Sequence, residues 1–284
     1  MTHQYLVVDQ NFLRTDALRD MLRAQRQIRI VLPDLAMFEM AKSTNRKLTI
    51  NQSLSIVAEE PGRVFVSHAL GHCLSYELKN GVAVDGHMLD QKATKFLRKL
   101  LNAVSTGIRN PEYDGVIDDP ENHVSGMKRD YLDHTANKAR SLELLDVTKR
   151  SMTGEFAKRL RGSRATVDEK LDFIYEKAPS LLVGVLEENG FSREKATRFY
   201  RKKPMILRYF FAKLWACLSW EEQGRIEGLS PAKVSNDLID HQYVLAATYF
   251  DGVLSEEPAV NEAYAAVQQL LARAQPLAQA ERQR

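Results

Sequence analysis

The sequence is poor in cysteine. Cys73 and Cys217 are the only cysteines among 284 residues, which is too few for a cysteine-rich zinc site, and no spacing rule pairs them. Structural disulfides are therefore not predicted. We expect both residues to be reduced thiols that pack as small buried hydrophobic side chains, as in a cytosolic protein.

The sequence also lacks a long apolar run. A membrane-spanning helix needs ~18 to 20 uninterrupted apolar residues, and Arg208 and Lys213 interrupt the most apolar segment, residues 205–220. The first nine residues contain neither a basic leader nor a long apolar stretch, so no secretion signal is predicted. We therefore expect a cytoplasmic protein that has no membrane partner.

Neither a phosphate-binding glycine loop nor a strong charge imbalance is present. The glycines at 184, 190, 224 and 228 are isolated, and no Gly-x-x-x-x-Gly-Lys motif occurs, which disfavours a nucleotide-fuelled activity. Forty basic residues stand against 37 acidic ones, so the overall charge indicates no particular partner and only local clusters can.

What the sequence does contain is an ordinary globular composition, with 44% hydrophobic and 27% charged residues, which excludes disordered, collagen-like and disulfide-rich classes. The length allows either one large domain or a domain of about 150 residues with a substantial second element. Core size is not limiting in either case.

The first eighty residues alternate between strand and helix patterns. Short β-branched or apolar runs at 5–8, 28–32 and 63–67 predict strands. A helix capped by Asn11 or Thr15 is expected after the first strand, and a second helix is expected over 33–42, where Pro33 suits the first turn. This alternation predicts an α/β fold with a parallel central sheet.

The pattern then becomes helical and later returns to α/β. Residues 90–233 show helical periodicity without a convincing strand; a helix over 237–248, a strand over 250–254 and a helix over 258–274 follow. We predict a discontinuous α/β domain formed by residues 1–85 and 235–274, a large all-helical insertion over 90–233, and a flexible Ala/Gln-rich tail over 275–284.

Acidic residues stand where the predicted strands end or where nearby helices begin. They are Asp9, Glu39, Asp237, Asp240 and Asp251. Ligands of open parallel sheets bind at the carboxyl ends of the strands, so these acids can converge in space. Carboxylates held close together repel one another, and a divalent cation with oxygen ligands, Mg²⁺ or Mn²⁺, relieves the repulsion.

Each acid also has a structural alternative. Asp237 follows Asn236 and would be a good helix cap, which by itself explains one of the two acids of that helix. Glu39 could be a solvated surface residue. Asp9 is harder to dismiss, because a carboxylate directly after Leu-Val-Val must either cap the next helix or serve a site.

Together these motifs resemble the PIN-like nuclease domains. The resemblance is carried by residues 5–9, 31–40, 236–247 and 250–257. Matched residue by residue, Asp9 corresponds to the first acid of the family, Glu39 to the second and Asp240 to the third, with Asp237 as a close competitor. For the fourth acid, Asp251 and Glu257 compete, and Ser255 matches the small hydroxyl residue that often supports the metal site.

The resemblance implies a three-layer PIN-like domain and a metal-dependent endoribonuclease. Asp9, Glu39, Asp240 and either Asp237 or Asp251 would hold one or two Mg²⁺ or Mn²⁺ ions, and hydrolysis would leave 5′-phosphate and 3′-hydroxyl ends. Two alternatives stay open: a DNA or structure-specific nuclease of the same fold, and a catalytically inactive scaffold that binds RNA or protein.

Basic residues in the helical segment are candidates for binding the nucleic acid. The cluster most suited to single-stranded RNA interleaves cations and aromatic side chains and comprises Arg198, Tyr200, Arg201, Lys202 and Lys203. Its alternative is an amphipathic helix with core aromatics and solvated charges. Because a free nuclease harms its host, we also expect control by an inhibitory or activating protein partner or by homo-oligomerisation, as in a toxin or phage-defence nuclease.

Overall fold

The computed structural model describes residues 2–41, 45–84, 88–106, 133–223 and 226–274. The chain forms two compact units. Unit 1 comprises Met1–Leu70, His87–Asp133 and Gln242–Asn261, and unit 2 comprises Gly71–Gly86, His134–His241 and Glu262–Arg284. The predicted tail, residues 275–284, lies outside the described residues.

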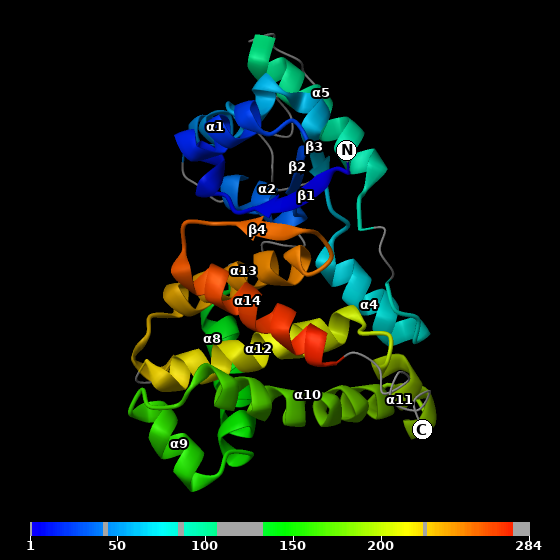
Figure 1. The fold of residues 1–284 in the computed structure, drawn as a ribbon, viewed down its shortest axis with the longest axis vertical. Helices are drawn as coiled ribbons and strands as arrows, with labels where there is room; N and C mark the ends of the chain where they lie inside the picture. Colours follow the sequence, from blue (N-terminus) through cyan, green and yellow to red (C-terminus); the bar gives the residue numbers. More distant parts are fainter. Residues whose placement is uncertain (1, 42–44, 85–87, 107–132, 224–225, 275–284) are drawn as a thin grey trace. The chain divides into compact units, whose positions relative to one another are not determined.

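Unit 1 is built on a four-stranded sheet of order β3-β2-β1-β4 in which every pairing is parallel. The strands are β1 (Gln4–Val8), β2 (Ile28–Leu32), β3 (Val64–Val66) and β4 (Gly252–Leu254). Figure 1 shows β1 between β2 and β4. Each strand overlaps a predicted one, so the α/β class with a parallel sheet is confirmed.

The inner strands are buried because helices cover the sheet, as parallel sheets require. Val7, Val8, Ile30, Val31 and Leu32 have no exposed surface. The helices of unit 1 are α1 (Asp16–Ala24), α2 (Asp34–Ala41), α3 (Arg46–Leu54) and α5 (Gln91–Thr106), with short 3-10 turns at Phe12–Arg14, Val57–Glu59 and Pro61–Arg63.

Local sequence explains where α1 begins and what it buries. The hydroxyl of Thr15 accepts a hydrogen bond from the backbone N–H of Leu18 at 3.2 Å, which caps the helix. Leu18 and Leu22, four residues apart, are the buried side chains of the helix. Thr15, rather than Asn11, is therefore the cap of α1.

Helix α5 belongs to the sheet unit, although the sequence pattern groups it with the helical segment. Thr94 Oγ1 accepts a hydrogen bond from Val66 N at 2.9 Å, and Arg98 Nε donates to Val64 O at 3.1 Å. These contacts cover β3, which is an edge strand of the sheet. Periodicity identifies α5 as a helix but does not indicate which unit it packs against.

The described elements of unit 2 are helical. They include α4 (Leu70–Asn80), α8 (His134–Arg150), α9 (Gly154–Arg161), α10 (Val167–Glu188), α11 (Arg193–Tyr200), α12 (Met205–Glu222) and the turn η4 (Ile226–Gly228). Helices α13 (Pro231–Ala247) and α14 (Pro258–Arg273) contribute residues to both units. No helix of the described chain combines the length and apolarity that crossing a membrane requires.

A buried glutamate supports the start of α12. Pro204 precedes helix α12, and its side chain makes no capping hydrogen bond to the helix. Instead, the fully buried carboxylate of Glu77 on α4 accepts hydrogen bonds from Met205 N at 2.8 Å, Ile206 N at 2.9 Å and Val84 N at 2.9 Å. Burial raises the pKa of Glu77 although these donors act to lower it.

Helix α13 begins earlier than predicted. Pro231 occupies its first turn, and Lys233 N donates to Ser230 Oγ at 3.2 Å, so Ser230 caps the helix. Asp237 and Asp240 consequently lie beyond the first turn. The prediction that Asp237 caps this helix and meets the positive end of its dipole is wrong, because Ser230-Pro231 is an earlier start signal.

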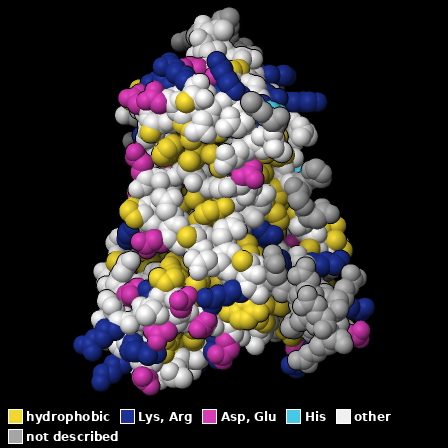
Figure 2. Space-filling view, in the orientation of Figure 1, with side chains coloured by type: hydrophobic (Ala, Val, Ile, Leu, Met, Phe, Trp, Pro, Cys, Tyr) yellow, Lys and Arg dark blue, Asp and Glu magenta, His cyan; other side chains and the backbone are white. Residues whose placement is uncertain are grey.

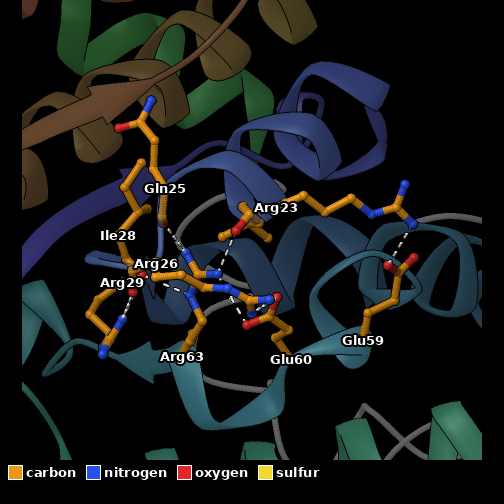
Figure 3. A network of polar contacts seen from close by, with 9 residues as sticks. Arg23, Gln25, Arg26, Ile28, Arg29, Glu59, Glu60 and Arg63 are labelled. Carbon is orange, nitrogen blue, oxygen red and sulfur yellow. Dashed lines mark hydrogen bonds and ion pairs between the residues drawn. The ribbon is translucent and has the colours of Figure 1, made fainter.

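Arg63 forms a network of hydrogen bonds at the amino-terminal end of β2, where α1 ends and the chain turns into the strand. Arg63 is 7% exposed and donates to Leu22 O at 2.6 Å, Gln25 O at 2.6 Å and Ile28 O at 3.0 Å, and its ion pair with Glu60 spans 3.0 Å. Figure 3 shows its guanidinium among these groups, whereas Arg23 points outward to Glu59.

Arg63→Lys should destabilise the protein by at least about 2 kcal/mol, because an ammonium cannot serve three backbone carbonyls in the planar arrangement that a guanidinium provides. Chemical denaturation measures the change. Arg23→Lys is the matched control: its side chain is 65% exposed and pairs with Glu59 at 3.4 Å, so its cost should stay below about 1 kcal/mol. Equal costs for the two variants would contradict the role assigned to Arg63.

Candidate functional site

Asp9 lies at the carboxyl end of the central strand. Its backbone N–H donates to Leu254 O at 3.1 Å, which continues the pairing of β1 with β4. Its side chain is 5% exposed, and Oδ1 accepts a hydrogen bond from Phe12 N at 2.9 Å. One carboxylate oxygen of Asp9 thus caps the 3-10 turn Phe12–Arg14, and this fixes the orientation of the group.

Glu39 meets a buried tyrosine that the sequence patterns did not single out. The hydroxyl of Tyr243, a residue that is 1% exposed, donates to Glu39 Oε2 at 2.6 Å. Tyr243 therefore links α13 to α2 within unit 1.

The electrostatics of Tyr243 place both acids near its hydroxyl. Its pKa is raised well above the usual value, first by burial, then by the charge and hydrogen bond of Glu39, and further by the charge of Asp9, while the Gln10 N–H acts in the opposite direction. Asp9 and Glu39, which are thirty residues apart along the chain, therefore both act on this one hydroxyl of unit 1.

One sequence signal could have identified Tyr243. It lies three residues after Asp240, and residues three apart on a helix share a face. A tyrosine one turn after a candidate acid has a hydroxyl that can orient a neighbouring carboxylate. The apolar run that follows, residues 244–247, is equally typical of a core position.

Asp251 does not join the other acids of unit 1. Its carboxylate accepts a hydrogen bond from Tyr5 N at 2.7 Å, and its own N–H donates to Tyr5 O at 2.8 Å. Because β4 runs parallel to β1, with Leu6 opposite Gly252 and Val8 opposite Leu254, Asp251 lies at the opposite end of the strands from Asp9. Its predicted place in the acidic cluster is therefore corrected: a residue at the start of this strand lies at the amino-terminal edge of the sheet, away from Asp9.

Ser255 and Glu257 follow β4 and lie at the same edge as Asp9. The Ser255 hydroxyl accepts a hydrogen bond from Glu257 N at 3.0 Å, in the turn that leads into α14. Glu257 is exposed. The local role of Ser255 is to stabilise this turn, and its proposed support of a metal site stays a prediction.

Asp237 and Asp240 belong to unit 2. Asp237 Oδ1 pairs with Lys233 at 2.7 Å, and Oδ2 accepts a hydrogen bond from Trp220 Nε1 at 2.9 Å. Both carboxylate oxygens of Asp237 are thus engaged in contacts within unit 2. Asp240 is half-buried on α13, and its assignment as the third acid stays a prediction.

His241 is held neutral beside Asp237. Burial lowers its pKa to about 4; a contact between Nδ1 and the Asp237 carbonyl opposes this shift, and the charge of Lys213 adds to it. A half-buried histidine of this kind is neutral at neutral pH, and its ring nitrogen Nδ1 is engaged by the Asp237 carbonyl.

The basic residues predicted to bind nucleic acid are partly committed to the fold of unit 2. Lys203 Nζ donates to Leu271 O at 2.8 Å near the carboxyl end of α14, and Arg198 pairs with Glu194 at 3.6 Å. Tyr200 is half-buried, which raises its pKa. Arg201 and Lys202 are exposed, so the cluster contains two solvent-facing cations without an aromatic platform that is equally exposed.

The two carboxylates that act on Tyr243 have the donor chemistry that Mg²⁺ or Mn²⁺ requires. Such ions prefer oxygen ligands, and Mg²⁺ is often held by one or two carboxylates together with water and substrate phosphates. Asp9 and Glu39 fit this description. Within the described ranges, no three His, Cys, Asp or Glu side chains form a group that could hold a metal ion by itself.

Comparisons with known proteins returned no relative: no family model matches the chain, and neither the curated proteins nor the solved structures contain a significant match.

Tyr243→Phe should lower the free energy of unfolding by about 1–3 kcal/mol, because it removes the hydrogen bond that Glu39 accepts from the buried hydroxyl. Urea denaturation tests this. Tyr76→Phe, which alters an exposed tyrosine of α4, is the matched control and should change stability little. A Tyr243 variant as stable as this control would show that the hydroxyl contacts contribute nothing.

The buried neutral His241 should make the fold sensitive to acid. Because its pKa falls from 6.5 to about 4 on folding, the unfolded chain binds more protons in this window, and stability decreases as the pH falls through it, by up to about 3 kcal/mol. Denaturation midpoints measured across the window should fall less steeply for His241→Gln than for the wild type. His72→Gln, at an exposed site on α4, should keep the wild-type profile.

Proposed function

We propose that the chain is a metal-dependent endoribonuclease of the PIN-like type, with Asp9, Glu39 and Asp240 as its acidic residues. The observation that carries the proposal is the hydrogen bond from Tyr243 to Glu39, at a hydroxyl on which the charge of Asp9 also acts. Asp9 directly follows β1 of a parallel sheet, and open α/β sheets bind their ligands at the carboxyl ends of their strands. Asp240 is included because it shares a helix face with Tyr243.

The residues of unit 1 have distinct roles in this proposal. Asp9 and Glu39 hold the divalent cation, and each keeps a fixed orientation because a neighbouring donor engages one of its oxygens: Phe12 N for Asp9 and Tyr243 Oη for Glu39. When bound, Mg²⁺ or Mn²⁺ supplies charge neutralisation at the phosphate and a water that ionises near neutral pH. Tyr243 acts as a positioning residue because it contacts a ligand-binding carboxylate and not the substrate.

RNA is the proposed substrate because the resemblance is to nucleases that usually cleave RNA, and the expected products carry 5′-phosphate and 3′-hydroxyl ends. Carboxylates and a cation act on the phosphate and do not distinguish ribose from deoxyribose, so a DNA or structure-specific nuclease shares the same site. Unit 2 is the proposed place of control by a protein partner or by assembly of several copies.

A binding scaffold without catalytic activity is the second candidate. The observation that favours it is the engagement of Glu39 by Tyr243 in a buried contact, which stabilises the fold without any metal. The two candidates differ in one measurable property: the scaffold retains RNA binding but has no divalent-dependent cleavage.

Asp9→Asn and Glu39→Gln should each reduce cleavage of labelled single-stranded RNA by at least about a hundredfold, because each removes a charge from the cation site while keeping a similar shape. Cleavage is followed on gels with Mg²⁺, with Mn²⁺ and with EDTA, on RNA, single-stranded DNA and duplex DNA.

The matched control is Asp20→Asn, the same substitution at an exposed position of α1, which should keep wild-type activity. Circular dichroism and denaturation establish that each variant is folded. Full activity of the folded Asp9 and Glu39 variants would refute the assignment, and the absence of cleavage by the wild type on all three substrates would favour the scaffold.

A further inference from the structure

Helix α5 carries a row of lysines on its solvent-facing side. Lys92, Lys95 and Lys99 are exposed, and the helix contains no acidic residue. Its remaining cation, Arg98, is used inward, where it donates to Val64 O and to Gly62 O and lies over the ring of Phe65. Figure 2 shows dark-blue Lys and Arg side chains over the region that Figure 1 labels α5.

The spacing of the three lysines gives them one face and a regular separation. Positions i, i+3 and i+7 lie on the same side of a helix. At about 1.5 Å per residue, the row extends about 10 Å along the helix axis. A stacked nucleic-acid strand carries one negative charge per about 3.4 Å, so the row has the length of about three consecutive phosphates.

Nearby acids are already engaged by other groups. Asp90 caps α5 through Ala93 N at 2.9 Å and lies 3.7 Å from His68 Nδ1. On the turns packed against α5, Glu59 pairs with Arg19 and Arg23, and Glu60 pairs with Arg26 and Arg63. Among the residues that the structure describes, no ion pair reaches Lys92, Lys95 or Lys99, so no described acid neutralises their charge.

The row lacks the apolar neighbours that a membrane-binding helix needs. Amphipathic helices that lie on lipid place exposed hydrophobic side chains beside their cations. In α5 the leucines at 97, 100 and 101 are buried in unit 1. A polyanion that offers only charge, and no apolar surface, is the better match.

We propose that Lys92, Lys95 and Lys99 form a lysine row that binds the phosphate backbone of a single-stranded RNA substrate outside the acidic site. This inference rests on the proposed ribonuclease function and names a substrate-binding surface for it. The row supplies affinity and orientation without reading the base sequence, because lysine acts as a point charge on phosphate.

The test measures binding of labelled oligouridylate to the full-length chain by fluorescence anisotropy, in EDTA, between about 50 and 200 mM salt. The triple variant Lys92→Gln, Lys95→Gln, Lys99→Gln should bind more weakly. The slope of log affinity against log salt should become shallower by about 2, since each lost contact to a single strand accounts for about 0.7. The corresponding triple arginine variant should keep the wild-type slope and affinity.

The matched control removes three positive charges from exposed positions of unit 2 instead, as Lys79→Gln, Lys158→Gln, Arg164→Gln. This variant should keep the wild-type slope. An equal decrease in both triple variants, or an unchanged slope in the α5 variant, overturns the proposal. It is also overturned if the α5 variant loses binding to anionic vesicles but keeps the wild-type slope for RNA. EDTA prevents cleavage, so this experiment measures binding alone, and an unchanged slope would refute only the lysine row. Full activity of the Asp9→Asn variant in the cleavage assay would refute only the nuclease assignment.

Discussion

The parallel pairing of β1 with both β2 and β4 is the constraint on which the rest of unit 1 depends. It joins residues more than two hundred positions apart, since Leu6 lies opposite Gly252 and Val7 opposite Val253. Parallel strands end at a common edge, so the residues after β1 and β4 are neighbours whatever the intervening chain does. Asp9 and Ser255 lie at this edge because they follow β1 and β4. Glu39 lies on α2, the helix that follows β2.

The Tyr243 hydroxyl fixes the orientation of Glu39 close to that edge. A buried phenol that donates to one carboxylate and lies in the field of another has a raised pKa and stays protonated, so it remains a donor to Glu39. This one contact links α13 to α2 within unit 1, and the proposed nuclease chemistry starts from the carboxylate that it orients.

Unit 2 uses comparable side chains for a different purpose. Glu77 is a fully buried carboxylate, yet its three backbone donors make it a cap for α12. Asp237 forms an ion pair with Lys233 and a hydrogen bond with Trp220, and Lys203 donates a hydrogen bond to a carbonyl of α14. The charge pattern of the sequence does not separate such structural roles from functional ones, because both place ionisable groups at helix ends. The lysine row of α5 differs in that its charges have no such partner among the described residues.

The sequence by itself determined the strands, the α/β class and the candidacy of Asp9 and Glu39, because strand runs, turns and a carboxylate at a strand end are local signals. It also indicated that Asp240 and Asp237 compete, but it could not choose between them. Only tertiary contacts show that Asp237 is engaged, that Asp251 faces the other edge and that Tyr243 donates to Glu39. These facts depend on register and on partners distant in sequence, and a local pattern contains no information about either.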